Sequence, residues 1–91
     1  MIPLSENPAV FDPMRTLNAN QREAVSSIAF FRHQRVEGGT WTIGPKRFSK
    51  RTIDVLERWQ LVREERNKTL SLTTAGKLVA DKLKGPSHGN A

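Results

Sequence analysis

Two stretches decide the fold of this chain: TIDVLERWQLV at residues 52–62 and LSLTTAGK at residues 70–77. In the first stretch, Ile53 and Leu56 recur at the spacing of one helical face, and an apolar run follows. In the second, leucines alternate with polar residues as in a half-buried strand, and a threonine suited to a helix N-cap comes next. The expected order is therefore a helix, a β-hairpin that turns near Asn67, and a further helix.

A longer helix is predicted upstream of these stretches. Asn20 is a suitable N-cap, and Glu23 stands three residues later, at the spacing of a capping box. Apolar residues then recur at steps of three and four as far as Val36, and the pair Gly38-Gly39 is expected to end the helix.

The segment between the two helices has the composition of a strand. Thr40–Ile43 is rich in β-branched and aromatic side chains, and Gly44-Pro45 should stop it. Ser49 is a suitable N-cap for the second helix, although Pro45 could equally occupy the first turn of a longer helix. Residues 46–48 before that cap fit either a helical stub or a strand.

The two ends of the chain differ from the centre. Prolines at positions 3, 8 and 13 predict an extended arm over residues 1–16, because proline removes backbone donors. Residues 85–91 have no apolar anchor and are expected to be a disordered tail. The last helix, capped by Thr73 or Thr74, should bury Ala75, Leu78, Val79 and Leu83 on one side. Gly76 should let this helix approach the sheet closely.

Length, charge and cysteine content exclude several classes of protein. The chain has 91 residues, with 15 Lys+Arg against 9 Asp+Glu and a formal net charge of +6. It contains no cysteine, so disulfides and thiolate metal sites are excluded. No run approaches the roughly 18 apolar residues of a membrane span, and the first fifteen residues lack the features of a signal peptide. We expect one small cytoplasmic domain with no membrane contact and a polyanionic partner.

The stretches at residues 52–62 and 70–77 resemble the winged helix-turn-helix regulators of the MarR and PadR type. In those families a recognition helix runs into a Gly-Leu-Val corner, a β-hairpin wing follows, and a Leu-Thr-x-x-Gly sequence opens the next helix. The resemblance covers residues 17–84. It implies an α+β winged-helix domain, ordered as helix, short strand, recognition helix, β-hairpin wing and C-terminal helix, that binds duplex DNA and regulates transcription.

Two departures from the family pattern are visible. Gln60 stands where those families have the corner glycine, so it must adopt a positive φ or a different turn. In addition, residues 39–45 cannot supply the usual second helix, because a Gly-Pro pair and β-forming residues occupy that place.

The resemblance and the charge pattern together predict a DNA-contacting surface. Four cations lie within residues 46–51 with no acid among them, and phosphate contacts dominate the affinity of basic domains for duplexes. The residues expected to neutralise phosphates are Lys46, Arg47, Arg63, Arg66 and Lys68. Those expected to meet base edges are Ser49, Lys50, Arg51, Asp54 and Arg58. An ion pair between Asp54 and Arg58 is also expected from their spacing.

Other functions remain open from the sequence. A winged helix can bind a protein, with Phe30 or Phe31 as an apolar anchor, and these adjacent rings also suggest a homodimer. Trp41 or Trp59 could stack on the bases of RNA or single strands, although core packing is the alternative. His33 and His88 have no second ligand at metal spacing. We expect no cofactor and no enzymatic activity, because no catalytic arrangement is present.

Overall fold

The computed structural model describes residues 3–31, 33–66 and 68–84. Its helical elements are η1 (Leu4–Glu6), α1 (Pro8–Phe11), α2 (Pro13–Thr16), α3 (Ala19–Phe30), α4 (Lys50–Arg58) and α5 (Thr74–Lys84). Its strands are β1 (Gln34–Glu37), β2 (Thr40–Ile43), β3 (Lys46–Ser49), β4 (Val62–Glu64) and β5 (Leu70–Leu72). The chain is thus an α+β domain, as predicted.

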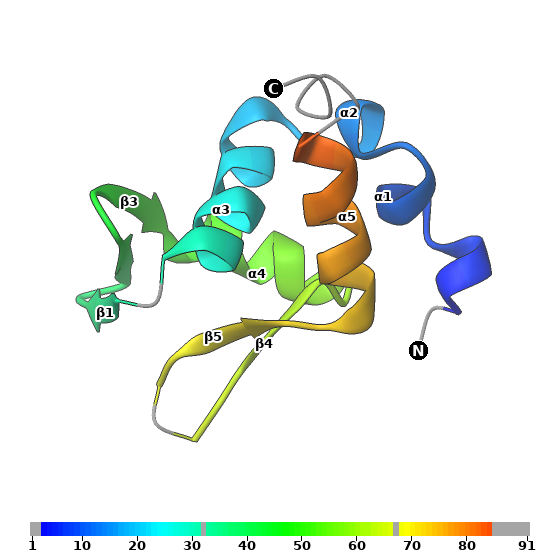
Figure 1. Ribbon diagram of the computed structural model, residues 1–91. Helices are drawn as coiled ribbons and strands as arrows, with labels where there is room; N and C mark the ends of the chain where they lie inside the picture. The colour runs from blue at the N-terminus through cyan, green and yellow to red at the C-terminus, as the bar shows by residue number, and fades with distance from the viewer. Residues whose placement is uncertain (1–2, 32, 67, 85–91) are drawn as a thin grey trace.

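The strands form two separate antiparallel sheets (Figure 1). One is the meander β1-β2-β3, and the other is the hairpin β4-β5, which we call the wing. Both sheets border the helices, and the wing extends away from them. This arrangement is compatible with a small winged-helix-like fold.

The described part of the N-terminal segment, residues 3–16, consists of short helices, so the prediction of an extended arm was wrong for these residues. Pro8 and Pro13 each stand at the first position of a short helix, where no intrahelical donor is needed. Asn7 caps α1 by accepting a hydrogen bond from the backbone of Ala9, and both residues are buried. Proline here starts helical turns and does not prevent them.

The first long helix begins and ends earlier than predicted. Its capping box joins Asn18 and Gln21, two residues before the expected pair. The helix ends at Phe30, because Phe31 is already extended. Val36 lies in strand β1 and still packs against the core, which is why its spacing imitated a helical face.

The meander occupies the place of the missing second helix. Gly38 and Gly39 both have positive φ and form the two-residue turn between β1 and β2. Thr40–Ile43 is a strand, as predicted, and residues 46–48 belong to a strand and not to a helical stub. Trp41, Ile43 and Phe48 are buried in the core. They share one face of this sheet because successive side chains of a strand point to opposite faces and Trp41 pairs with Phe48.

The start of α4 and the turn at Gln60 that follows it have the backbone conformations that the sequence predicted. Ser49 caps α4 by accepting from the backbone N–H of Thr52, and Ile53 and Leu56 are buried, all as predicted. Gln60 has a φ of 62°, so it adopts the left-handed conformation that a glycine would take there.

The last helix packs directly on this corner. The hydroxyl of Thr73 accepts a hydrogen bond from the Gly76 N–H and caps α5. A Cβ added to Gly76 would lie 2.0 Å from the Leu61 carbonyl oxygen, so the predicted close approach is confirmed. Ala75 and Val79 are buried as expected, whereas Leu78 is exposed.

Residues 85–91, including His88, lie outside the described residues. Within the described part of the chain, no helix combines the length and the apolar character needed to cross a bilayer.

Candidate nucleic-acid interface

Helix α4 is held in place at both of its ends. At its start, the amide of Asn20 donates to the Thr52 hydroxyl over 3.2 Å. At its end, the buried side chain of Asn7 donates to the Trp59 carbonyl oxygen over 2.8 Å. These bonds tie α4 to α3 and to the N-terminal segment, so the exposed face of α4 has a fixed direction.

That exposed face carries a groove of about 530 Å³, lined by Lys50, Arg51, Asp54, Val55 and Arg58. Four of these five residues are predicted site residues, so the structure brings the α4 members of the set together. The buried stripe of α4 contacts α3 from the other side. The groove therefore opens away from the body of the domain.

Ion pairs divide the predicted cations into two groups. Three of them are paired: Lys46 with Glu23, Lys50 with Asp54, and Arg63 with Glu65. Asp54 thus pairs with Lys50, and not with Arg58 as expected. Within residues 3–31, 33–66 and 68–84, the cations without an ion pair include Arg47, Arg51, Arg58, Arg66 and Lys68. An unpaired exposed cation is available to an anion without first breaking a bond.

Ser49 was predicted both as the N-cap of this helix and as a base-contacting residue, and the structure shows the capping role. Its hydroxyl accepts from the Thr52 backbone and lies 3.2 Å from the Thr52 hydroxyl. These bonds cap α4 and fix the point where β3 passes into the helix.

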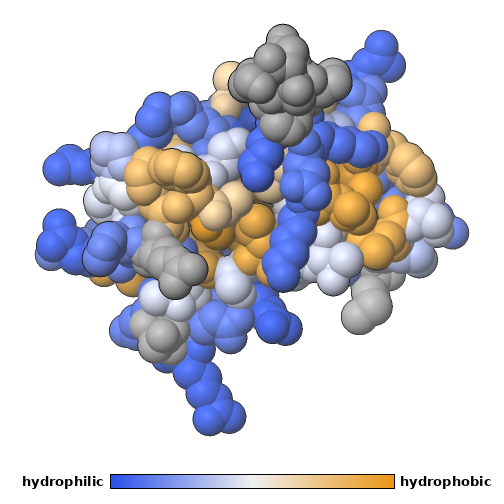
Figure 2. All heavy atoms as spheres, viewed as in Figure 1, coloured by the Kyte–Doolittle hydropathy of each residue, from blue (hydrophilic) through white to orange (hydrophobic). Residues whose placement is uncertain are grey.

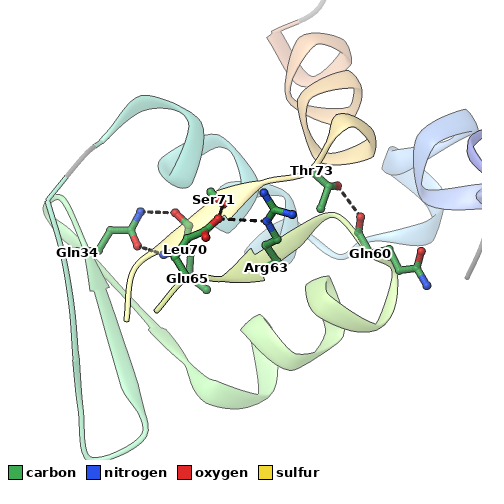
Figure 3. Close-up of polar contacts among 7 residues, drawn as sticks. All are labelled: Gln34, Gln60, Arg63, Glu65, Leu70, Ser71 and Thr73. Atoms are coloured by element: carbon green, nitrogen blue, oxygen red, sulfur yellow. Dashed lines mark hydrogen bonds and ion pairs between the residues drawn. The ribbon is translucent and has the colours of Figure 1, made fainter. Parts of the chain in front are cut away.

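Polar bonds hold the wing (Figure 3). The Gln34 side-chain amide donates to the Leu70 carbonyl oxygen over 2.9 Å and accepts from the Leu70 N–H over 2.5 Å. It therefore imitates a neighbouring strand along β5. Glu65 accepts from the Ser71 hydroxyl and from Arg63, which joins β4 to β5 from within the wing.

Two glutamates near α4 and the wing have shifted pKa values of opposite sign. The hydrogen bond from Ser71, followed by the bond and charge of Arg63, lowers the pKa of Glu65. Partial burial raises the pKa of Glu57, and the charges of Asp54 and Glu64 raise it further. The fold therefore favours the ionised form of Glu65 on the wing and disfavours the ionised form of Glu57 on α4.

The two tryptophans are unequal as stacking surfaces. Trp41 is 4 % exposed and belongs to the core, so it cannot present a ring face to a base. Trp59 is partly buried and also packs against the core.

The exposed large apolar side chains lie elsewhere. Among the described residues they are Leu4, Phe11, Met14, Phe30 and Leu78, on η1, α1, α2, α3 and α5. Figure 2 shows apolar surface gathered over the helices on the face that it presents. Phe30 is 79 % exposed and lies edge-on to the ring of Phe31. Ser26, Ala29, Phe30, Ala80 and Lys84 line a groove of about 280 Å³ there.

Three residues that line or support the candidate interface were not identified from the sequence. Val55 was not singled out, although its place between Arg51 and Arg58 on the helix face was a usable signal. Asn7 bonds to Trp59, 52 positions along the chain, and Gln34 bonds to Leu70, 36 positions along. The sequence around Asn7 and Gln34 therefore does not indicate these roles.

No group of three or more His, Asp or Glu side chains in the described part of the chain is arranged to hold a metal ion. The chain matches no family model, no curated protein and no solved structure.

Proposed function

We propose that this chain is a winged-helix domain that binds duplex DNA through α4 and the wing, and that it regulates transcription. The observation that carries the proposal is the groove on α4, where Arg51 and Arg58 have no ion pair within the described residues. Guanidinium groups on an exposed helix face suit the guanine edges of a major groove, which admits an α-helix.

The groove also offers an apolar contact. Val55 is partly exposed beside the two arginines, and an aliphatic side chain in this position suits the methyl group of thymine. Asp54 is held by Lys50, which neutralises an acid that would otherwise repel phosphates. The α4 face therefore combines groups that can discriminate between base pairs.

The wing and β3 supply phosphate contacts in this proposal. Arg47, Arg66 and Lys68 are exposed and have no ion pair among the described residues. Three neutralised phosphates correspond to a slope of about −2.7 for log K against log salt. Affinity for any duplex should then fall roughly 40-fold between 50 and 200 mM salt.

The test is fluorescence anisotropy with a random 25-base-pair DNA duplex, single-stranded DNA and duplex RNA, each at 50 and 200 mM salt. Preference for the DNA duplex with this salt dependence would support the proposal. Preference for single strands or for duplex RNA, or an absence of binding at 50 mM salt, would contradict it.

Once a preferred sequence has been selected, two variants separate the roles of α4 and the wing. Arg51→Ala should cost about 1–3 kcal/mol on that sequence and little on random duplex. Lys68→Ala should weaken both duplexes alike. If both variants lost the same amount of affinity on every sequence, base reading by α4 would be contradicted. The proposal that the domain binds duplex DNA would still stand.

A second candidate function, contact with a protein, is favoured by the exposure of Phe30 beside its apolar groove. A second copy of the chain is one such partner. Sedimentation at several concentrations tests this candidate: a concentration-dependent dimer that Phe30→Ser abolishes would support it, and a monomer throughout would remove the homodimer.

A further inference from the structure

The meander has a solvent-facing side that the site prediction did not include as a unit. Strand register places Arg35 opposite Thr42 and Thr42 opposite Arg47. These three residues therefore form one row across β1, β2 and β3 on the same face of the sheet. Arg35 and Arg47 are exposed, and neither has an ion pair among the described residues.

The outer face of the meander is turned away from α3, as the α4 groove is. The opposite face of the meander, with Trp41 and Phe48, belongs to the core and contacts α3. The buried stripe of α4 also contacts α3. Since both elements turn their apolar sides toward α3, the Arg35–Arg47 row and the α4 groove both face away from it.

The chain also brings the row close to α4 and to the wing. Arg47 precedes Ser49 by two residues on the same face of β3, a distance of about 7 Å along the strand, and Ser49 caps α4. Gln34, the neighbour of Arg35, bonds to β5 of the wing. The meander, α4 and the wing are therefore directly connected neighbours.

A hollow next to the row contains further hydrogen-bonding groups. It has a volume of about 300 Å³ and is lined by His33, Gln34, Arg35, Thr42 and Gly44. A guanidinium and a hydroxyl at one hollow can both donate to phosphate oxygens. One acid opposes them on this face: Glu37 occupies the next row, opposite Thr40.

We propose that the outer face of the meander is a second phosphate-contacting surface, through which Arg35 and Arg47 hold the backbone of the duplex that α4 reads. This inference rests on the proposed function and adds Arg35 to the interface. The longest dimension of the domain is 36 Å, which equals about eleven base pairs at 3.4 Å per step. In this proposal Arg35 and Arg47 contact phosphates in addition to those held by the wing.

The first test measures the salt dependence of binding to random 25-base-pair duplex. Arg35→Ala should reduce the slope of log K against log salt by about 0.9, and Arg35→Ala with Arg47→Ala by about 1.8. Between 50 and 200 mM salt, the wild type should then lose about 12-fold more affinity than the double variant. Arg15→Ala is the control, since Arg15 lies on α2 and pairs with Asp12.

The second test predicts a gain. Glu37→Gln removes the acid that opposes the row, so it should tighten random-duplex binding several-fold at 50 mM salt and have less effect at 200 mM. Glu6→Gln, an exposed change on η1, makes the same change of charge elsewhere and should have a much smaller effect.

The outcomes distinguish this inference from the proposed function. Wild-type protein that fails to bind duplex would overturn both. The meander surface alone would be overturned if Arg51→Ala weakens binding to the preferred sequence and Lys68→Ala weakens binding to every duplex, while the Arg35→Ala, Arg47→Ala double variant keeps the wild-type salt slope. A smaller slope in the double variant together with a gain in Glu37→Gln would support it. Because these side chains are exposed, circular dichroism should show unchanged folding in every variant.

Discussion

The meander and the wing are both small antiparallel sheets with exposed cations, yet they are attached to the domain in different ways. The meander places Trp41, Ile43 and Phe48 in the hydrophobic core. The wing places the smaller side chains of Val62 and Leu70 in the same core, and it adds polar bonds from Gln34 to Leu70 and within the Glu65 network. The comparison teaches that similar charged surfaces can rest on supports of different strength.

The difference bears on how each sheet could serve a duplex. A sheet anchored by buried aromatic area is a rigid support, because that burial is a large stabilising contribution in a small core. Among its described residues, the wing buries only aliphatic side chains, and each of its hydrogen bonds contributes only about 1 kcal/mol. We therefore expect the wing to open locally before the meander does.

The largest effect is expected from Trp41→Ala, which empties the aromatic site of the meander. Truncation of a buried tryptophan costs about 3–5 kcal/mol, a large part of the stability of a small domain. Urea denaturation followed by circular dichroism measures this loss. A change below about 1 kcal/mol would show that the meander does not depend on its apolar face.

Gly76→Ala comes next and tests the anchor of the wing at α5. Alanine normally stabilises a helix interior by about 1 kcal/mol relative to glycine. Here the new methyl group would meet the Leu61 carbonyl oxygen, so we expect a loss of about 1–3 kcal/mol. Lys77→Ala, an exposed change on the same helix, is the control. A more stable Gly76→Ala protein would contradict the close approach.

Gln34→Ala removes the amide that pairs with β5. The free energy of unfolding should fall by about 1–2 kcal/mol, because the Leu70 N–H and carbonyl groups lose their partner. Hydrogen exchange of the Leu70 amide should accelerate as well. Arg35→Ala is the matched control on the same strand. Unchanged exchange at Leu70 would mean that the wing holds its position without Gln34.

Glu57→Gln should stabilise the protein slightly, unlike the three substitutions above. The raised pKa of Glu57 means that folding disfavours the ionised carboxylate, so stability is lost as pH rises through this pKa. The glutamine variant should melt slightly higher at pH 7, and its advantage should fade as pH drops toward the ordinary value of 4.5. Thermal melts at pH 4 and pH 7 measure the difference.

Glu65→Gln provides the reverse pH dependence within the wing. The lowered pKa of Glu65 means that folding favours its carboxylate, so its contribution is present at neutral pH and lost as pH falls through that pKa. The variant should melt slightly lower at pH 7 and match the wild type in acid. Melting shifts of the same sign for both glutamates would contradict the assigned environments.

The sequence predicted the elements whose signals are local. Ser49 indicated the start of α4, and Thr73 indicated the start of α5. The alternation of Leu70 and Leu72 with polar residues indicated β5. A cap or an alternation involves neighbours in the chain, so its energy depends little on distant contacts. Gly38-Gly39 was also a hairpin signal, but the helical spacing of Val36 suggested a longer α3.

By itself, then, the sequence determined the α+β class, the amphipathic α4, the wing and the concentration of positive charge around them. Only the tertiary structure decided that the segment before α4 is a meander, which cations are paired, and how Asn7 and Gln34 fix α4 and the wing. The physical reason is that local patterns set the backbone conformation of each element, whereas ion pairs and long-range hydrogen bonds depend on which side chains the fold brings together.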